Sequence, residues 1–111
     1  MIRIIAGVYK GRFLKVPDPN VTRPTMDKVR QAIFNAMKDK AVNSICLDLF
    51  AGSGAMGLEA LSRGAKQVYF NDKDRKTFQI MKENILSLET DKDRFVMANS
   101  DYRLFLKMFS D

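Results

Sequence analysis

The segment Asp48–Ala60, DLFAGSGAMGLEA, holds residues whose types and spacing are suited to chemistry. Its glycines Gly52, Gly54 and Gly57 fit the Gly-x-Gly-x-x-Gly pattern, in which small residues let the backbone approach a ligand and the helix start favours an anionic group. Asp72 follows Gly54 by 18 residues, near the spacing of a carboxylate that binds both hydroxyls of a ribose. The pattern predicts a site for a nucleoside-containing cofactor; the alternative is a glycine turn used only for packing.

Asp48 indicates which cofactor this loop would hold. It lies in the apolar stretch ICLDLF, and a carboxylate in a sheet covered on both faces costs several kcal/mol unless something pairs with it. S-adenosylmethionine carries an ammonium and a sulfonium, whereas the pyrophosphate of NAD would be repelled. The residue therefore favours S-adenosylmethionine, and a buried aspartate that caps a neighbouring turn is the alternative.

The elements that position these residues alternate along the chain. Strands are predicted over 45–50, 67–72 and 94–98, with a helix from the glycine loop to Arg63, stopped by Gly64. Two further helices are predicted from apolar stripes, formed by Phe78, Met81, Ile85 and Leu88 and by Tyr102, Phe105, Leu106 and Phe109. This order predicts an α/β fold with a parallel sheet and right-handed crossovers.

The segment before the glycine loop is basic. Residues 1–40 carry nine Lys or Arg and three Asp, whereas residues 41–111 carry ten side chains of each sign, so the whole net charge of +6 precedes the loop. Such asymmetry predicts contact with a polyanion, and a solvated basic surface is the alternative.

The same segment has its own predicted elements. RIIAG and RFLKV around VYKG predict a hairpin, and VPDPNVTRP predicts a loop. Thr25 is expected to cap a helix that ends near Asp39. Its apolar residues at helical spacing are Met26, Val29, Ile33, Ala36 and Met37.

Composition excludes several classes of protein and site. A chain of 111 residues is one domain at most, and the lack of histidine removes His-based catalysis and the commonest metal ligand, so no metal site is predicted. Cys46 has no partner for an internal disulfide and is expected to be a small core residue. No apolar run is long enough to span a bilayer and no signal segment is seen, so a cytoplasmic location without membrane contact is expected.

Five segments, in order, carry a resemblance to a known family: RIIAGVYKGRFLKVP, TRPTMDKVRQAIFNAM, LDLFAGSGAMGLEALSRGA, VYFNDKDRKTFQIMKEN and NSDYRLFL. Together they span essentially the whole chain, which closely resembles the bacterial methyltransferases that modify the N2 of a guanine in 16S ribosomal RNA. The resemblance implies a Rossmann-like S-adenosylmethionine-dependent methyltransferase fold. Residues 1–40 would form a basic, RNA-facing hairpin and helix, and residues 41–111 the first half of the Rossmann-like domain.

The resemblance also implies roles for individual residues. Around the methionine end of S-adenosylmethionine it places Asp48, Phe50, Ala51, Gly52, Ser53 and Gly54. Asp72 would hold the ribose, and near the adenine it places Lys73, Ser100 and Asp101. From the residues alone, Asp101 could equally be a helix cap. The resemblance further implies that ribosomal RNA or the small ribosomal subunit is contacted by Arg3, Lys10, Arg12, Arg23 and Arg30. Asn71, where the family more often has an apolar or small residue, is expected to be tolerated.

One departure from the family concerns catalysis. The family resembles other amino-group methyltransferases in having an Asp-Pro-Pro-aromatic segment on the fourth strand, whereas the prolines here are Pro17, Pro19 and Pro24. A guanine amino group needs acceptors for its hydrogens and an aromatic face for the base, and no catalytic residue is therefore assigned. The sheet is expected to be incomplete, with its first strand as an exposed edge. Either the chain is a fragment of a longer enzyme or this edge pairs with another copy.

Two other functions remain open at this point. A non-catalytic RNA-binding module would keep the basic segment with a vestigial loop, and would bind RNA with a steep salt dependence but no cofactor. A dinucleotide-dependent oxidoreductase is disfavoured by Asp48 and by the lack of a substrate domain. Charge alone does not distinguish RNA from DNA.

Overall fold

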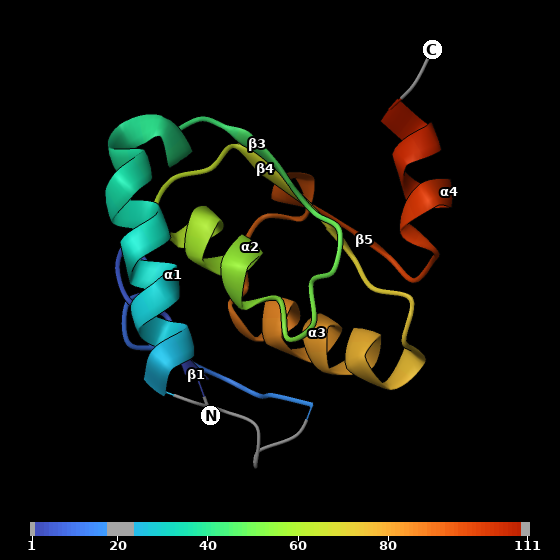
Figure 1. Cartoon of the computed structure of the whole chain (residues 1–111), viewed down its shortest axis with the longest axis horizontal. Helices are drawn as coiled ribbons and strands as arrows, with labels where there is room; N and C mark the ends of the chain where they lie inside the picture. Colours follow the sequence, from blue (N-terminus) through green and yellow to red (C-terminus); the bar gives the residue numbers. More distant parts are fainter. Residues whose placement is uncertain (1, 18–23, 110–111) are drawn as a thin grey trace.

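The described part of the chain contains a three-stranded parallel sheet, which lies along one side of the molecule (Figure 1). In the computed structural model, which describes residues 2–17 and 24–109, its strands are β3 (Ile45–Asp48), β4 (Gln67–Asn71) and β5 (Phe95–Ala98), in the order β3-β4-β5. Asp48 pairs in register with Phe70, and Asn71 with Ala98. The predicted α/β class and incomplete parallel sheet are confirmed. Each strand is one or two residues shorter than predicted.

Helices connect these strands and end where the sequence signals indicate. They are α2 (Ala55–Ser62) and α3 (Arg75–Ser87), followed by the short α4 (Tyr102–Leu106), which leads into a 3-10 turn at Lys107–Phe109. Gly54 precedes α2 with a φ of 86°, and Gly64 follows it with a φ of 106°, both in the left-handed region that favours glycine. Asp74 caps α3 by accepting from the amide of Thr77 at 2.9 Å. No helix among the described residues is long and apolar enough to span a membrane.

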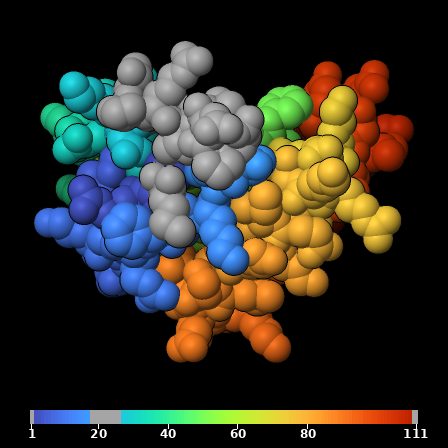
Figure 2. Space-filling view, turned by 90° about the horizontal axis from the view of Figure 1, so that it is seen from below, coloured from blue at the N-terminus to red at the C-terminus, as the bar shows by residue number. Residues whose placement is uncertain are grey.

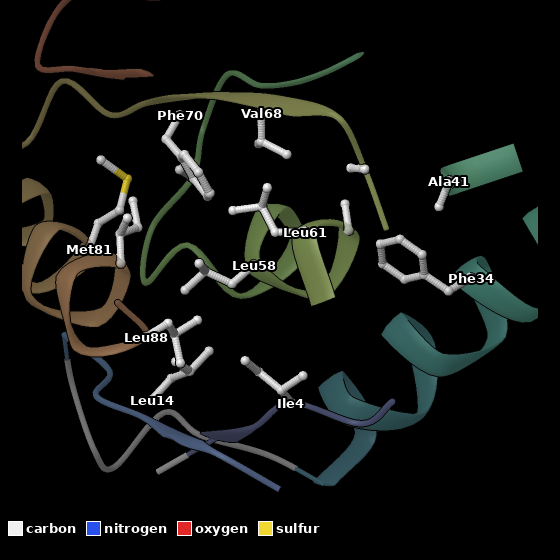
Figure 3. Close-up of a cluster of buried hydrophobic side chains, with 14 residues drawn as sticks. Ile4, Leu14, Phe34, Ala41, Leu58, Leu61, Val68, Phe70, Met81 and Leu88 are labelled. Atoms are coloured by element: carbon white, nitrogen blue, oxygen red, sulfur yellow. The ribbon is translucent and has the colours of Figure 1, made fainter. Parts of the chain in front are cut away.

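The hydrophobic core lies between the sheet and α2 and α3 (Figure 3). Leu58 and Leu61 of α2 meet Val68 and Phe70 of β4 there, and all four are fully buried. A Cβ at Gly57 would lie 2.3 Å from Phe70 Cε1, so α2 sits directly on β4. The same cluster includes Ile4, Leu14 and Phe34, so the N-terminal segment shares this core. Cys46 is half-buried and packs against it.

The predicted N-terminal hairpin is present but short. β1 (Ile2–Arg3) pairs antiparallel with β2 (Phe13–Leu14), and Ile4 extends the pairing through bonds with Arg12 and Gly11. The pairing stops there because the next two amides, of Ile5 and Ala6, donate to the Glu59 carboxylate instead.

In helix α1 (Pro24–Met37) and in α4, the buried side chains differ from those predicted. α1 begins at Pro24, so Thr25 lies in its first turn rather than before it. Among its side chains from residue 27 onward, Arg30 and Phe34 are buried, whereas Val29 and Ile33 are 53 % and 41 % exposed. In α4 only Phe105 is buried. The predicted loop largely falls on residues 18–23, outside the described residues.

The other face of the sheet is thinly covered. Tyr69 of β4 packs edge-on against Phe109, with ring centroids 4.9 Å apart, but Ile45 and Leu47 of the edge strand β3 are 59 % and 45 % exposed. Among the described elements only β4 pairs with β3. The predicted exposed edge is therefore present.

Candidate cofactor-binding site

Two carboxylates hold the glycine loop at the carboxyl ends of β3 and β4. Asp48, the last residue of β3, accepts from the amide of Gly57 through Oδ2 at 3.3 Å. Asp72, just after β4, accepts from the amide of Gly52 through Oδ2 at 3.0 Å and from Asp74 through Oδ1 at 2.9 Å. Because the strands are parallel, both groups lie at the edge of the sheet where ligands bind in open α/β folds.

The backbone of the loop makes a tight turn between these two contacts. Gly52 and Gly54 have φ values of 57° and 86°, and the amide of Gly54 donates to Ala51 at 2.8 Å. Ala51 in turn donates to the carbonyl of Asn71 at 2.8 Å, so the loop is anchored on β4. The loop is thereby preorganised around Asp48 and Asp72.

The pKa of Asp48 is raised above its ordinary value. Burial is the main cause; the Gly57 amide acts in the opposite direction, and the neighbouring Asp72 carboxylate raises it further. This carboxylate therefore favours a positive partner, because a cation would offset both the burial and the repulsion from Asp72.

Asn71 ties together the segments that follow all three strands. Its Nδ2 donates to the carbonyls of Leu49 and Ser100, at 3.2 and 3.0 Å, and its Oδ1 accepts from the amide and hydroxyl of Ser100, at 3.2 and 3.0 Å. The side chain is almost fully buried. The residue expected merely to be tolerated therefore positions Ser100 beside the loop.

Asp101 and Lys73 lie next to this edge. Asp101 caps α4 by accepting from the amide of Arg103 at 2.8 Å, and both of its oxygens also pair with the Arg103 guanidinium. These side-chain and backbone bonds from Arg103 lower the pKa of Asp101 to about 2. Lys73 is exposed. The predicted cap is thus present, and Asp101 stays ionised.

Phe50 lies on the outer side of the loop. Its side chain is 71 % exposed, and its ring centroid lies 5.2 Å from that of Tyr102. Ser53, by contrast, is buried, and its carbonyl accepts from Asn84 at 2.8 Å. The predicted loop residues are therefore adjacent in space, but they face different directions.

The predicted RNA-facing residues fall into two groups. Arg3, Lys10 and Arg12 are exposed, and Arg12 also donates to the carbonyl of Ser87 at 2.7 Å. Arg30 is only 4 % exposed, and its Nε pairs with Glu59 at 3.2 Å. We therefore correct the role predicted for Arg30, because a buried and paired guanidinium is not available to phosphate. Arg23 lies outside the described residues.

Glu59 fastens the basic segment to α2. It is fully buried and accepts from the amides of Ile5 and Ala6, at 2.9 and 3.0 Å, as well as from Arg30 and Arg63. Ser62, one turn later, accepts from the amide of Tyr9 at 2.9 Å and donates to the carbonyl of Ala6. The helix that starts at the glycine loop thus also holds the N-terminal segment.

Sequence reasoning did not identify three of these polar residues. Glu59 is the only charge in AMGLEALS, Asn71 follows the apolar run VYF at the end of β4, and Asn84 lies three residues from Met81 on the apolar face of α3. A lone polar residue at a buried position was the available signal in each case.

The part of the chain that the structure describes holds no cluster of side chains suited to a metal ion. There, no three His, Cys, Asp or Glu side chains gather at metal-binding distance. A hollow of about 460 Å³ lies at the opposite end of the sheet, lined in part by Lys66, Gln67, Asp93 and Arg94. It is remote from the glycine loop.

Comparison with known proteins identifies relatives along nearly the whole chain. The family model described as "Conserved hypothetical protein 95" matches residues 2–110. Ribosomal RNA small subunit methyltransferase D of Escherichia coli is 46 % identical over 99 residues, covering 89 % of this chain and 50 % of that protein. The protein of the same name in Haemophilus influenzae is 41 % identical over 106 residues, covering 96 % and 55 %.

A solved structure gives the same result. The structure of yhhF from Escherichia coli superposes with a TM-score of 0.81 at 42 % identity, covering 95 % of this chain and 55 % of that one. The chain therefore spans about half the length of the curated relatives it matches.

Proposed function

Because the chain belongs to the family described as "Conserved hypothetical protein 95", we propose that it is the cofactor-binding and RNA-facing part of an S-adenosylmethionine-dependent ribosomal RNA methyltransferase. The observation that carries this proposal is the pair of carboxylates, Asp48 and Asp72, that hold amides of one glycine loop. The names of the relatives, which specify small-subunit ribosomal RNA, support the substrate class. The N2 of a guanine is the proposed acceptor, and the cytoplasm is the proposed location.

The site residues suit the two polar ends of S-adenosylmethionine, which supplies a methyl group on a sulfonium. Asp48 would pair with the ammonium of the methionine end, since a cation would offset the burial and the repulsion from Asp72 that raise its pKa. Asp72 would accept from the ribose hydroxyls, because each of its oxygens holds one amide and keeps a further lone pair. The loop residues Phe50, Ala51, Gly52, Ser53 and Gly54 would line the methionine end.

The adenine would lie near the segment after β5. Ser100 is held by Asn71. Asp101 Oδ1 already accepts two hydrogen bonds from Arg103, whereas Oδ2 accepts one and can also accept from an adenine amino group. Lys73 would lie beside the ring. No residue among these is proposed to deprotonate or orient the guanine.

The proposed RNA surface lies in residues 1–40, with Arg3, Lys10 and Arg12 as exposed cations and Arg23 as a further contact. This segment carries the whole net charge of +6, which supports binding to phosphate. Residues 41–111 would then form the cofactor-binding unit. The small ribosomal subunit or its RNA is the proposed partner.

We also propose that the free edge of β3 is an association surface. In doubly wound sheets a fourth strand pairs with the first, and here that edge carries the exposed side chains of Ile45 and Leu47. A second copy of this chain would cover it. Leu47→Lys should then abolish a concentration-dependent dimer in analytical ultracentrifugation, and an unchanged monomer at all concentrations of the parent chain would reject this surface.

Calorimetric titration of S-adenosylhomocysteine into the chain, with NADH as the control ligand, tests the proposed function. Saturable one-site binding of S-adenosylhomocysteine alone is the expected result, and binding of NADH alone would instead favour an oxidoreductase. RNA binding without binding of either cofactor would favour the non-catalytic RNA-binding module. Competition between ribosomal RNA and DNA of equal length, at a stated salt concentration, separates the two nucleic acids.

A further inference from the structure

Asn84 lies in α3 between the basic N-terminal segment and the glycine loop. Its side chain is 3 % exposed, and all of its hydrogen-bonding groups are used. Oδ1 accepts from the amide of Lys15 at 2.8 Å, and Nδ2 donates to the carbonyls of Lys15 and Ser53, each at 2.8 Å. One amide group therefore holds a residue of the N-terminal segment and a residue of the loop at once.

The surroundings of Asn84 are otherwise apolar. It lies on the face of α3 that also carries Met81, Ile85 and Leu88, all of them buried. A polar side chain in such a place is unfavourable unless its partners stay within hydrogen-bond distance. Lys15 and Ser53 consequently cannot move independently without leaving buried polar groups unpaired.

The N-terminal segment makes two further contacts with α3. The Arg12 guanidinium donates to the carbonyl of Ser87, and Lys15 Nζ pairs with Glu83 at 3.2 Å. Figure 2 shows the later part of this segment, in light blue, lying against α3, in yellow to orange. A cation proposed to bind phosphate, Arg12, is thus three residues away from the backbone that Asn84 holds.

We infer that Asn84 is a positioning residue that couples the two ligand sites, so that nucleic acid bound to the N-terminal segment and cofactor bound at the glycine loop strengthen each other's binding. This inference rests on the proposed function. Nucleic acid on Arg12 would restrain the segment against α3, and Asn84 would pass that restraint to Ser53. The loop would then lose less freedom when the cofactor binds.

Such coupling is reciprocal and can be measured as a ratio of affinities. The dissociation constant of S-adenosylhomocysteine is measured by calorimetry with and without saturating small-subunit ribosomal RNA. For the unmodified chain we expect RNA to tighten cofactor binding about fivefold or more, the lower end of typical coupling. For Asn84→Ala we expect this ratio to fall close to one.

Glu83→Gln is the matched control for Asn84→Ala. It removes the charge from the neighbouring ion pair between α3 and Lys15, but Glu83 is exposed and does not reach the loop. The coupling ratio should stay within about twofold of that of the unmodified chain, since only the bridge to Ser53 transmits the restraint.

A second pair of variants leaves the buried residue in place. Lys15→Pro removes the amide that donates to Asn84, whereas Lys15→Ala removes the same side chain and keeps that amide. Lys15→Pro should lower the coupling ratio relative to Lys15→Ala. This comparison remains informative if Asn84→Ala fails to fold.

The outcomes separate the inference from the function on which it rests. Binding of both ligands with a ratio near one in the unmodified chain would overturn the coupling and leave the proposed function standing. A large ratio that survives in both Asn84→Ala and Lys15→Pro would overturn the role of Asn84. A folded chain that does not bind S-adenosylhomocysteine would overturn the proposed function and the coupling together.

Discussion

The carboxylate of Asp48 and the amide of Gly57 are joined by a hydrogen bond of 3.3 Å that connects the end of β3 to the first turn of α2. This bond only partly offsets the burial that raises the pKa of Asp48. Asp48 is therefore held in place while its ionised form is disfavoured by burial, and a bound cation would stabilise that ionised form. The residue thus links the stability of the chain to ligand binding.

Asp48→Asn should separate these two effects. The raised pKa means that the folded state binds a proton more tightly than the unfolded state, so stability falls as pH rises from the ordinary value of 3.8 through the raised folded pKa. The variant keeps an acceptor for Gly57 and loses this pH dependence. Thermal denaturation between pH 4 and pH 7 should show a flatter profile and a higher midpoint at neutral pH.

The same variant should bind S-adenosylhomocysteine at least about tenfold more weakly, the scale of a lost hydrogen bond to a charged group. Affinity of the unmodified chain should rise with pH through the same window, because the cation needs the ionised carboxylate. Asp93→Asn, an exposed change away from the loop, is the control. A cofactor affinity independent of both pH and Asp48 would remove this residue from the site.

Asp72→Ala should weaken S-adenosylmethionine binding by about 1.5 to 3 kcal/mol. The substitution removes the proposed ribose acceptor and also leaves the amide of Gly52 without its partner. Asp72→Asn, which keeps one carbonyl acceptor, should be intermediate. Calorimetric titration measures all three chains, and equal affinities would place the ribose elsewhere.

Glu59→Ala should destabilise the fold by about 3 to 5 kcal/mol, the range for breaking a buried ion pair from one side. It removes the buried carboxylate that pairs with Arg30 Nε, leaving Arg30 with its ion pair to Asp27 at 3.3 Å, and it frees the amides of Ile5 and Ala6. Urea denaturation measures the loss. Glu59→Gln should be milder, since it keeps an acceptor for the amides, and a loss below about 1 kcal/mol in Glu59→Ala would contradict this role for the residue.

Arg12→Ala should affect RNA binding, whereas Arg30→Ala should affect the stability of the fold. Arg12 is exposed, so its loss should weaken RNA binding and reduce the slope of log affinity against log salt by about one unit. Arg30→Ala should lower the free energy of unfolding instead, and should leave that slope unchanged while the chain is folded. Lys92→Ala, an exposed change before β5, serves as the neutral control. Equal slopes for Arg12→Ala and Lys92→Ala would remove Arg12 from the RNA surface.

Local patterns were sufficient to predict the sheet and the position of the glycine loop. The loop glycines, Asp48 and Asp72 are close in sequence to strand ends, and parallel strands bring their carboxyl ends together without any further information. The stripe of α3 was also predicted correctly, because Met81, Ile85 and Leu88 repeat at helical spacing and are all buried.

The face of α1 could not be predicted in this way. Its apolar residues Val29 and Ile33 suggest one buried face, but the buried carboxylate of Glu59 requires a cation, and the helix turns Arg30 toward it. That requirement arises 29 residues further along the chain. Long-range polar satisfaction decided the orientation, and hydrophobic spacing does not report it.

The contacts that fasten the N-terminal segment also determine the order in which a newly made chain can fold. The amide of Ile5 hydrogen-bonds to Glu59, which is 54 residues later, and the guanidinium of Arg12 hydrogen-bonds to Ser87, which is 75 residues later. During synthesis this segment leaves the ribosome before the residues that hold it, so it is without all of its partners until α3 has emerged. The basic segment is translated before the residues that fasten it, and its contacts are therefore among the last to form.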